Sequence, residues 1–291
     1  MDLVSHVTLL GGACDRAALL ARCGRAAVDQ ALKDQVIVRL ARGRYALPSA
    51  HAARRTASAH SGVVSHRSAA QLLGWGMKDL PELPDVTFPR NRRVSASCRA
   101  VLQPHWAVLQ PGDVELGCTS VARTLYDCLR SLPFEQALPI ADSALRAGDV
   151  TPAALVRLAA RVRGPGRRVA GRVAIHATSR AANPFESVLR AIAVDVPGLD
   201  LEPQLPVRIN RRLTIHPDLG DASRRLAVEA EGFAWHGDAA ALTRDCVRYN
   251  ALALAGWTVI RFSWVLVMHQ PAYIRSTLER IESVLGHADA A

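Results

Sequence analysis

The sequence has no long apolar run, and it contains very little lysine. No window approaches the roughly 18 consecutive apolar residues of a membrane-spanning helix, so we expect no such helix. The apolar stretch near the N-terminus follows Asp2 rather than a basic segment, which argues against a secretory signal peptide. The sequence therefore predicts a cytoplasmic protein. The only lysines, Lys33 and Lys78, lie in the first third of the chain.

Cysteine is present, but in no arrangement that is typical of a metal site. None of the six cysteines forms a C-x-x-C pair, and no histidine cluster complements them at zinc spacing. Isolated thiols are typical of proteins from reducing compartments, where disulfides are rare. We therefore expect free and mostly buried thiols at Cys14, Cys23, Cys98, Cys118, Cys128 and Cys246.

The positive charge of the chain is unevenly distributed. The 291 residues carry a net charge of +10. Residues 1–60 contain nine basic and four acidic side chains, and residues 151–179 contain six arginines and no acid. The segments 61–150 and 180–291 are nearly neutral. This distribution favours a polyanionic partner, and charge that serves only solubility is the alternative.

The first 48 residues have the pattern of a small DNA-binding module. Asp15 is placed to cap a helix that ends at Gly24, and a second apolar stripe predicts another helix over 25–34. The alternating segment VIVRLARGRYAL turns at Arg42-Gly43, which predicts a basic hairpin. Helices followed by such a hairpin predict a winged helix-turn-helix, and a protein-binding unit is the alternative. The expected DNA contacts are Arg25, Lys33, Arg39, Arg42 and Arg44.

The segments that follow resemble a known family. VSHRSAAQLLGW at 64–75, VTFPRNRRV at 86–94, CTSVARTLYDCLR at 118–130 and ADSALRAG at 141–148 are similar to AbiEi-type antitoxins. The resemblance covers roughly residues 1–150 and implies that the winged helix binds the operator of its own operon. SVARTLYDCLR is also amphipathic, with Ser120 as the expected cap. We identify no catalytic constellation in this region, where Ser65 and His66 are adjacent without an evident partner.

Residues 149–180 predict a helix followed by a basic linker. The Gly-Pro-Gly sequence near residue 165 breaks any helix, and arginines flank it on both sides. These arginines are suited to follow a DNA backbone, and a solvated hinge is the alternative.

The last 110 residues predict a compact α/β domain. Asn183 and Pro184 begin a helix, and LPVRI, LTIHPDLGD and RRLAVEAEGFAWHG predict a three-stranded meander. A helix over 239–255, the strand WTVIRF and a closing helix over 271–286 follow. This order of elements is the core of restriction-endonuclease-like folds.

Two carboxylates in this domain indicate a metal site. Asp218 follows Pro217 at a strand end, and Glu229 lies within the apolar strand LAVEA, where an unpaired charge is costly. If the two strands pair, both carboxylates reach one hard cation, with the Ala230 carbonyl as a third ligand and Glu186 joining through water. Mg²⁺ held in this way activates water and stabilises a phosphate under attack. An exposed acidic strand face is the alternative.

The pattern Pro217-Asp218, ten residues, Glu229-Ala230-Glu231 resembles PD-(D/E)xK nucleases, with Glu231 in the lysine position. EAEGFAWHG and RDCVRYNALALAGWTVIRF are similar to the Vsr-like family, which is related to very-short-patch-repair endonucleases. This resemblance covers about 183–286 and implies that a second acidic residue is normal there, although usually aspartate. We expect Glu231 to bind or orient the metal ion. His236 is expected to transfer protons, and a surface or core-edge residue is the alternative. Arg244 and Arg248 are expected to hold phosphate or replace the lysine charge, unless they form surface ion pairs.

These observations predict an α/β multidomain protein. A winged helix-turn-helix over 1–60 precedes an AbiEi-like, mixed middle region over 61–150, the helix and linker over 151–180, and a PD-(D/E)xK nuclease-like domain over 181–291. The expected function is Mg²⁺-dependent DNA cleavage directed by the winged helix. A non-catalytic DNA-binding antitoxin or regulator with a degenerate nuclease fold, and a nuclease that acts on RNA, are the alternatives. DNA is the expected partner; a second copy of the chain and a toxin or defence-system protein are further candidates, and no membrane is involved.

Overall fold

The computed structural model describes residues 2–231 and 239–288, and it shows a mixed α/β protein. The chain forms two compact units. The first unit contains Met1–Trp75, Asp79–Ser131 and Arg157–Arg167, and the second contains Gly76–Lys78, Leu132–Val156 and Arg168–Ala291. Within the described ranges, no helix combines the length and the apolar composition needed to cross a bilayer. All six thiols are free; four are buried, Cys23 is half-buried and Cys246 is exposed.

Of the two N-terminal helices, the second was predicted from its cap at Asp15 and the first was not predicted. Helix α1 spans Leu3–Leu9, and α2 spans Arg16–Lys33 with the side chain of Asp15 accepting a hydrogen bond from the Ala18 amide. The backbone of Gly24 leaves the helical region, with φ at 72°, so α2 is two helical segments joined at a kink. The predicted break at Gly24 is therefore present.

The predicted hairpin consists of β2 (Val38–Ala41) and β3 (Arg44–Ala46), which turn at Gly43 with φ at 72°. Strand β1 (Ala13–Asp15) pairs with β3, so the sheet order is β1-β3-β2. The sequence analysis did not predict β1, because three residues between two glycines and a helix cap show no measurable alternation. Val7, Leu19, Val28 and Tyr45 pack in the core of this part.

The middle of the first unit is a five-stranded sheet in the order β6-β5-β4-β8-β7. Its core contains Val64, Val86, Phe88 and Leu102. The strands are β4 (Val63–Val64), β5 (Asp85–Phe88), β6 (Gln103–Trp106), β7 (Val114–Glu115) and β8 (Cys118–Thr119). The short helices are α3 (Ala52–Ala59), α4 (His66–Leu72), α5 (Ala96–Arg99) and the 3-10 turn η1 (Pro111–Asp113).

Helix α6 (Val121–Ser131) begins directly after Ser120, as the amphipathic pattern predicts. Its side chains Leu125, Cys128 and Leu129 are fully buried. Helix α7 (Phe134–Ala147) follows in the second unit and ends at Gly148, whose φ of 76° suits glycine.

The prediction of a basic linker up to residue 180 is wrong. Helix α8 (Pro152–Arg161) ends before the Gly-Pro-Gly break as expected, but a second helix, α9 (Arg167–His176), follows the break directly. Ala170 and Val173, three residues apart, are buried on one face of α9. The density of arginine obscured this short apolar stripe in the sequence.

The second unit contains a four-stranded sheet in the order β14-β13-β12-β9. Its strands are β9 (Glu202–Pro203), β12 (Leu219–Asp221), β13 (Leu226–Glu231) and β14 (Thr258–Ser263). The predicted three-stranded meander is wrong, because LTIHPDLGD forms two strands rather than one. Strand β11 (Thr214–Ile215) pairs with β10 (Val207–Arg208) in a separate hairpin, and Pro217, which cannot donate to a strand ladder, lies before β12.

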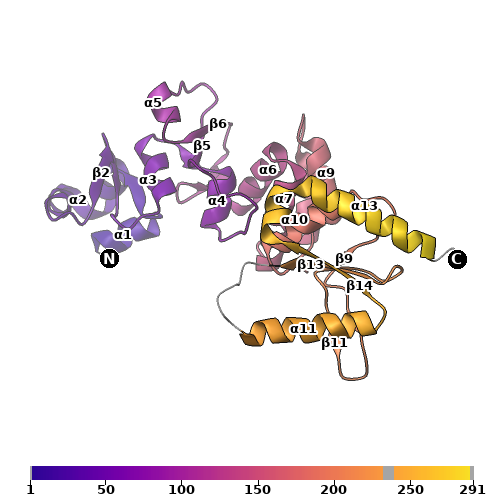
Figure 1. Cartoon of the computed structure of the whole chain (residues 1–291). Helices are drawn as coiled ribbons and strands as arrows, with labels where there is room; N and C mark the ends of the chain where they lie inside the picture. Colours follow the sequence, from indigo (N-terminus) through magenta and orange to yellow (C-terminus); the bar gives the residue numbers. More distant parts are fainter. Residues whose placement is uncertain (1, 232–238, 289–291) are drawn as a thin grey trace. The chain divides into compact units, whose positions relative to one another are not determined.

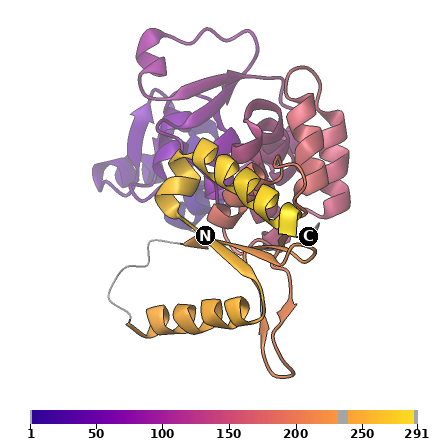
Figure 2. The same cartoon turned by 45° about the vertical axis from the view of Figure 1, so that its right-hand side comes forward.

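Helices cover both faces of this sheet. Helices α10 (Pro184–Ala193), α12 (Trp264–His269) and α13 (Pro271–Ala288) pack on one face, around Leu226, Val228 and Phe262 (Figure 1). Helix α11 (Ala239–Leu254) and the β10–β11 hairpin cover the other face, around Ala227 and Leu252 (Figure 2). Because side chains alternate along β13, Glu229 and Glu231 project toward the face of α11. The candidate site therefore lies on this second face.

Candidate functional site

A row of polar residues crosses the four-stranded sheet of the second unit. Asp218 precedes β12, and the register of β12 with β13 continues by one residue to place Asp218 opposite Glu229. The register of β12 with β9 places Gln204 opposite Asp218 in the same way, and the Gln204 amide donates to the Asp218 carbonyl at 3.1 Å. On the other side, Glu229 is paired directly with Arg261 of β14. Opposed residues share a face, so the four side chains form one line.

The two predicted metal ligands, Asp218 and Glu229, meet at the centre of this row. Glu229 is almost fully buried, with 2% of its surface exposed, and Asp218 is half-buried. Oδ2 of Asp218 accepts a hydrogen bond of 2.8 Å from the amide of Ala230. Oε1 of Glu229 receives no hydrogen bond from the described residues. The sheet register therefore brings together the two carboxylates that the sequence analysis singled out.

The environment of the pair disfavours two negative charges. Burial and the nearby charge of Asp218 together raise the pKa of Glu229 to about 8, against the opposing effect of Arg248. Burial also raises the pKa of Asp218 above its ordinary value. A carboxylate pair of this kind holds one proton at neutral pH, unless a cation replaces that proton.

Glu186, the third predicted metal residue, is occupied by hydrogen bonds. Its Oε2 accepts from the amide of Ala182 at 2.8 Å and from the Gln204 side chain at 3.0 Å, while Oε1 accepts from Asn183 at 2.8 Å. The same Gln204 amide nitrogen lies 3.3 Å from Oδ1 of Asp218. Glu186 therefore acts on the carboxylate pair through Gln204. Asn183 caps α10 as the sequence predicts, because its side-chain oxygen accepts a hydrogen bond from the Glu186 amide.

Arg248 of α11 lies against the carboxylate pair. Its Nη2 is 2.9 Å from Oε1 and 3.2 Å from Oε2 of Glu229, and it donates to the His216 carbonyl at 2.8 Å. The side chain is 30% exposed. A guanidinium in this position partly neutralises Glu229. Because it remains partly exposed to solvent, it can also bind an anion.

Arg244, one turn before Arg248, lines an open cavity of about 540 Å³ with it. Strand β11 also lines this cavity, with Thr214 and Ile215, and so does His216, which follows the strand. The two arginines that the sequence analysis paired therefore lie along the same hollow beside the carboxylates.

Glu231, which occupies the lysine position of the resembled nucleases, has cationic and phenolic partners. Arg261 donates from Nε to Oε1 of Glu231 at 2.8 Å, and the hydroxyl of Tyr249 donates to the same oxygen. Partial burial acts to raise the pKa of Glu231, but these hydrogen bonds lower it overall. A cation is thus present near the lysine position, supplied by the neighbouring strand.

Gln204, Tyr249 and Arg261 are members of the site that the sequence analysis did not find. A glutamine after the short strand β9 has no distinguishing pattern. Tyr249 follows Arg248 on a helix where the charged residues gave the stronger signal. Arg261 offered a signal, because a charged residue stands within the apolar strand WTVIRF. His236, the predicted proton-transfer residue, lies outside the described residues.

The predicted DNA-binding residues lie in the first unit. Arg25 and Lys33 are exposed on the second segment of α2, and Arg39 and Arg42 are exposed on the β2–β3 hairpin. Arg44 is partly covered and lies 3.9 Å from Asp15.

Among the described residues, no three His, Cys, Asp or Glu side chains are arranged around one point. Two protein carboxylates completed by water and substrate oxygens are, however, the usual way in which proteins hold Mg²⁺. Asp218 and Glu229 fit that mode, since Oε1 of Glu229 accepts no well-directed hydrogen bond from the described residues, although Nη2 of Arg248 lies 2.9 Å from it.

Comparison with known proteins gives few matches. No family model matches the chain. The uncharacterized proteins MT2308 and Rv2248, from two strains of Mycobacterium tuberculosis, are each 30% identical to it over 164 residues, or 56% of this chain. The match spans 60% of the length of these relatives. The crystal structure of the RV2827C protein from the same species has a TM-score of 0.32 and 17% identity, and the match covers 66% of this chain and 78% of that one.

Proposed function

We propose that the protein is a Mg²⁺-dependent DNA endonuclease whose site is centred on Asp218 and Glu229. The observation that carries the proposal is the pairing of buried Glu229 with half-buried Asp218 across neighbouring strands, with the pKa of Glu229 raised to about 8. Such an arrangement is unfavourable in the metal-free protein and becomes favourable when a divalent cation replaces the shared proton.

The residues around the pair have distinct roles in this proposal. Asp218 and Glu229 would hold the ion, which supplies activation of water and neutralisation of phosphate charge. Gln204 orients Asp218 through its side-chain amide, and Glu186 fixes Gln204. Arg248 is placed to exchange its contact with Glu229 for one with a substrate phosphate, because its guanidinium presents several donors in a plane. The cavity beside Arg244 and Arg248 would receive the nucleic-acid backbone.

The N-terminal part of the first unit is proposed as the winged-helix module that brings the site to DNA. Support comes from the kinked α2, the β2–β3 hairpin and the exposed basic residues Arg25, Lys33, Arg39 and Arg42 on these two elements. The second segment of α2 would enter the major groove, while Arg39 and Arg42 would meet phosphates on the hairpin.

Cleavage of supercoiled plasmid in the presence of Mg²⁺ tests the catalytic proposal. The wild-type protein is expected to nick or linearise the plasmid, and a chelator is expected to stop it. Glu229→Gln should lose the activity, because a neutral amide cannot replace a carboxylate ligand. Glu279→Gln, which changes an exposed glutamate on α13, is the matched control and should cleave like the wild type. Equal nicking by Glu229→Gln would show that the cleavage comes from a contaminant.

A second candidate function is DNA-binding regulation without catalysis. The ion pair of Arg248 with Glu229 favours it, because the guanidinium already compensates the carboxylate that a metal would otherwise satisfy. In that case the second unit serves as a partner-binding domain, and DNA binding needs no divalent ion.

Gel-shift binding of the region upstream of its own gene, with chelator present, separates the two candidates. The double variant Arg39→Ala/Arg42→Ala is expected to lower affinity and to reduce the slope of log affinity against log salt by about two, as two phosphate contacts are lost. Arg90→Ala/Arg93→Ala, which removes two exposed arginines elsewhere in the first unit, should leave that slope unchanged. Metal-independent, sequence-specific binding without cleavage under any divalent ion would favour the regulator.

A further inference from the structure

The first unit contains a second polar cluster, built around two stacked histidines. The rings of His66 and His105 lie 3.6 Å apart between centroids, with 17° between their planes. His66 begins α4 and His105 lies in β6, so segments 39 residues apart in the chain meet here. Neither residue takes part in the site of the second unit.

Each histidine has a buried polar partner. Nε2 of His105 is 2.8 Å from Oδ1 of Asp85, a carboxylate that is 2% exposed. Nδ1 of His66 lies 2.9 Å from the hydroxyl of Ser65, which in turn accepts a hydrogen bond of 2.8 Å from Thr87. These partners fix both rings, while Nδ1 of His105 and Nε2 of His66 form no hydrogen bond with the described residues.

Burying this polar cluster lowers the stability of the fold. The polar side chains of Asp85 and Ser65 are buried away from water. Oδ2 of Asp85 accepts no hydrogen bond from the described residues and lies 3.5 Å from Nε of Arg67. The backbone of His66 has a φ of 49°, in the left-handed region that a residue with a Cβ rarely adopts. Strain and buried polarity at one place are typical of binding sites.

A cavity of about 290 Å³ opens onto the two histidines. Helix α6 forms one wall with Arg123, Asp127 and Arg130, and Trp106 lies at the edge with 39% of its surface exposed. Thr87, Ala107, Ser131 and Pro165 complete the lining.

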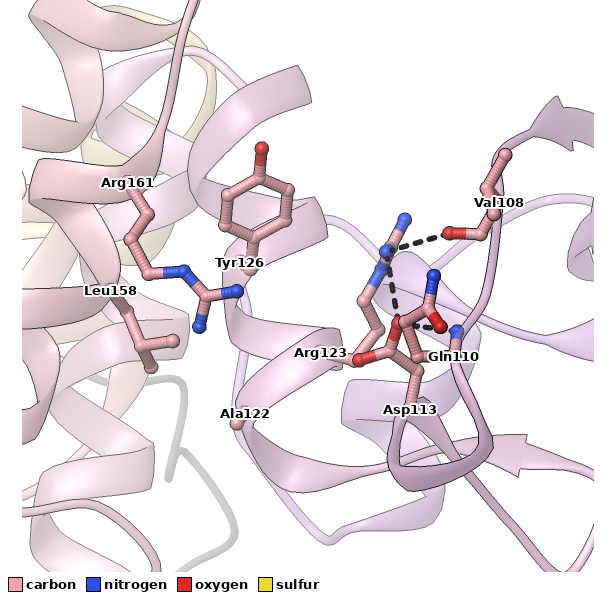
Figure 3. A pocket seen from close by; sticks show the side chains of 8 residues that line it. All are labelled: Val108, Gln110, Asp113, Ala122, Arg123, Tyr126, Leu158 and Arg161. Carbon is pink, nitrogen blue, oxygen red and sulfur yellow. Dashed lines mark hydrogen bonds and ion pairs between the residues drawn. The ribbon is translucent and has the colours of Figure 1, made fainter.

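Of the two arginines that line the cavity, Arg123 has carboxylate partners and Arg130 has none among the described residues. Both oxygens of Asp127 accept from Nε of Arg123, at 3.0 and 2.9 Å, and Asp113 holds the same guanidinium at 3.3 Å. Figure 3 shows the adjacent cavity that Arg123 also lines, with its guanidinium directed to Asp113 and the Val108 carbonyl. The guanidinium of Arg130, in contrast, forms no hydrogen bond or ion pair with another described residue.

We propose that this cavity binds a phosphate monoester, with Arg130 and His105 as its direct contacts. Arg130 supplies planar donors to phosphate oxygens, and the imidazole of His105 is held in place by Asp85. Burial, together with the nearby His105 and Arg123, lowers the pKa of His66 well below its ordinary value, so His66 contributes a neutral ring. The volume accommodates the phosphate with a sugar, and Trp106 at the edge is placed to stack on a base.

The phosphate can belong to a mononucleotide or to the 5′ end of a nucleic-acid strand, and the two sources share the same chemistry at this site. Calorimetric titration of the full chain distinguishes them with five probes: inorganic phosphate, a nucleoside, its 5′-monophosphate, a 5′-phosphorylated oligonucleotide and the same oligonucleotide with a 5′-hydroxyl. We expect the phosphorylated oligonucleotide or the mononucleotide to bind at least tenfold more tightly than its counterpart without phosphate. Equal affinity for the phosphorylated and hydroxyl oligonucleotides, with no binding of the mononucleotide, would overturn the proposal.

The variants Arg130→Ala and His105→Asn are expected to weaken phosphate binding by about tenfold or more each, because each removes a donor to a charged group. Arg130 is exposed, so its replacement leaves the core intact. Arg22→Ala, at an exposed position on α2, is the matched control for loss of one positive charge. A similar loss in Arg22→Ala and Arg130→Ala would show nonspecific attraction and contradict the assignment. Thermal unfolding of His105→Asn checks that its effect on binding is local.

Discussion

Asp142→Ala is expected to lower the free energy of unfolding by about 3–5 kcal/mol, the usual effect of removing one partner from a buried ion pair. Asp142 of α7 is fully buried, and its Oδ2 accepts a hydrogen bond from Arg190 of α10, which is 7% exposed. Oδ1 accepts from the amide of Thr178 at 2.8 Å. The alanine variant leaves a guanidinium in a low dielectric with only the His176 carbonyl as an acceptor.

Urea unfolding measures this effect, and two controls define it. Asp195→Ala removes one partner from the surface pair of Asp195 with Arg172, whose side chains are about 40% exposed, and should cost about 1 kcal/mol or less. The double change Asp142→Leu/Arg190→Met removes both buried charges and is expected to recover much of the loss. A loss below 1 kcal/mol for Asp142→Ala would show that the pair does not hold α7 against α10.

The local elements of the fold were predictable because their signals lie within a few residues. Asn183 and Pro184 mark the start of α10, and Gly256, with φ at 80°, ends α11. The turn at Gly43 between β2 and β3 follows from the same kind of rule. Caps and turns depend on backbone geometry that neighbouring residues set, so tertiary structure seldom overrides them.

Long-range pairings were not predictable in the same way. The pair Asp142–Arg190 joins residues 48 positions apart, and each member lies in an ordinary amphipathic helix. The stack of His66 on His105 depends on strand order in the five-stranded sheet. The sequence analysis found Ser65 and His66 but no partner, because β5 and β6 bring Asp85 and His105 to them only in the folded chain.

The candidate carboxylate site was predictable in part. A charged residue within an apolar strand signals a functional or paired group, and Glu229 carried that signal. Its meeting with Asp218 was predicted on the condition that their two strands pair, and the register shows that they do. The expected water-mediated role of Glu186 at the metal remains a prediction, because its carboxylate already accepts hydrogen bonds from the nearby Ala182 and Asn183 and from the more distant Gln204.

At a Mg²⁺ concentration below saturation, cleavage is expected to rise about ninefold from pH 6 to 7 and about fivefold from pH 7 to 8, or about fiftyfold in all. The reason is the raised pKa of Glu229, about 8 in the metal-free protein. Below that pH the group is mainly protonated, and the ion has to displace the proton before both carboxylates can act as ligands. Above pH 8 the rate should level off. A rate that stays flat from pH 6 to 8, in a protein whose activity still needs Glu229, would contradict this mechanism.

The stability of the metal-free protein gives an independent measure of the same group. The pKa of Glu229 is raised by folding from 4.5 to about 8, so the folded state binds this proton more tightly than the unfolded state. Its contribution to stability is fully present below pH 4.5 and is lost as the pH rises through about 8. Glu229→Gln removes the titrating group, so its free energy of unfolding should fall less over this range than that of the wild type, while Glu279→Gln should follow the wild type. Because this comparison involves neither metal nor DNA, a matching slope in the wild type and Glu229→Gln would disprove the raised pKa itself, whereas a flat cleavage profile alone would disprove only its link to metal binding.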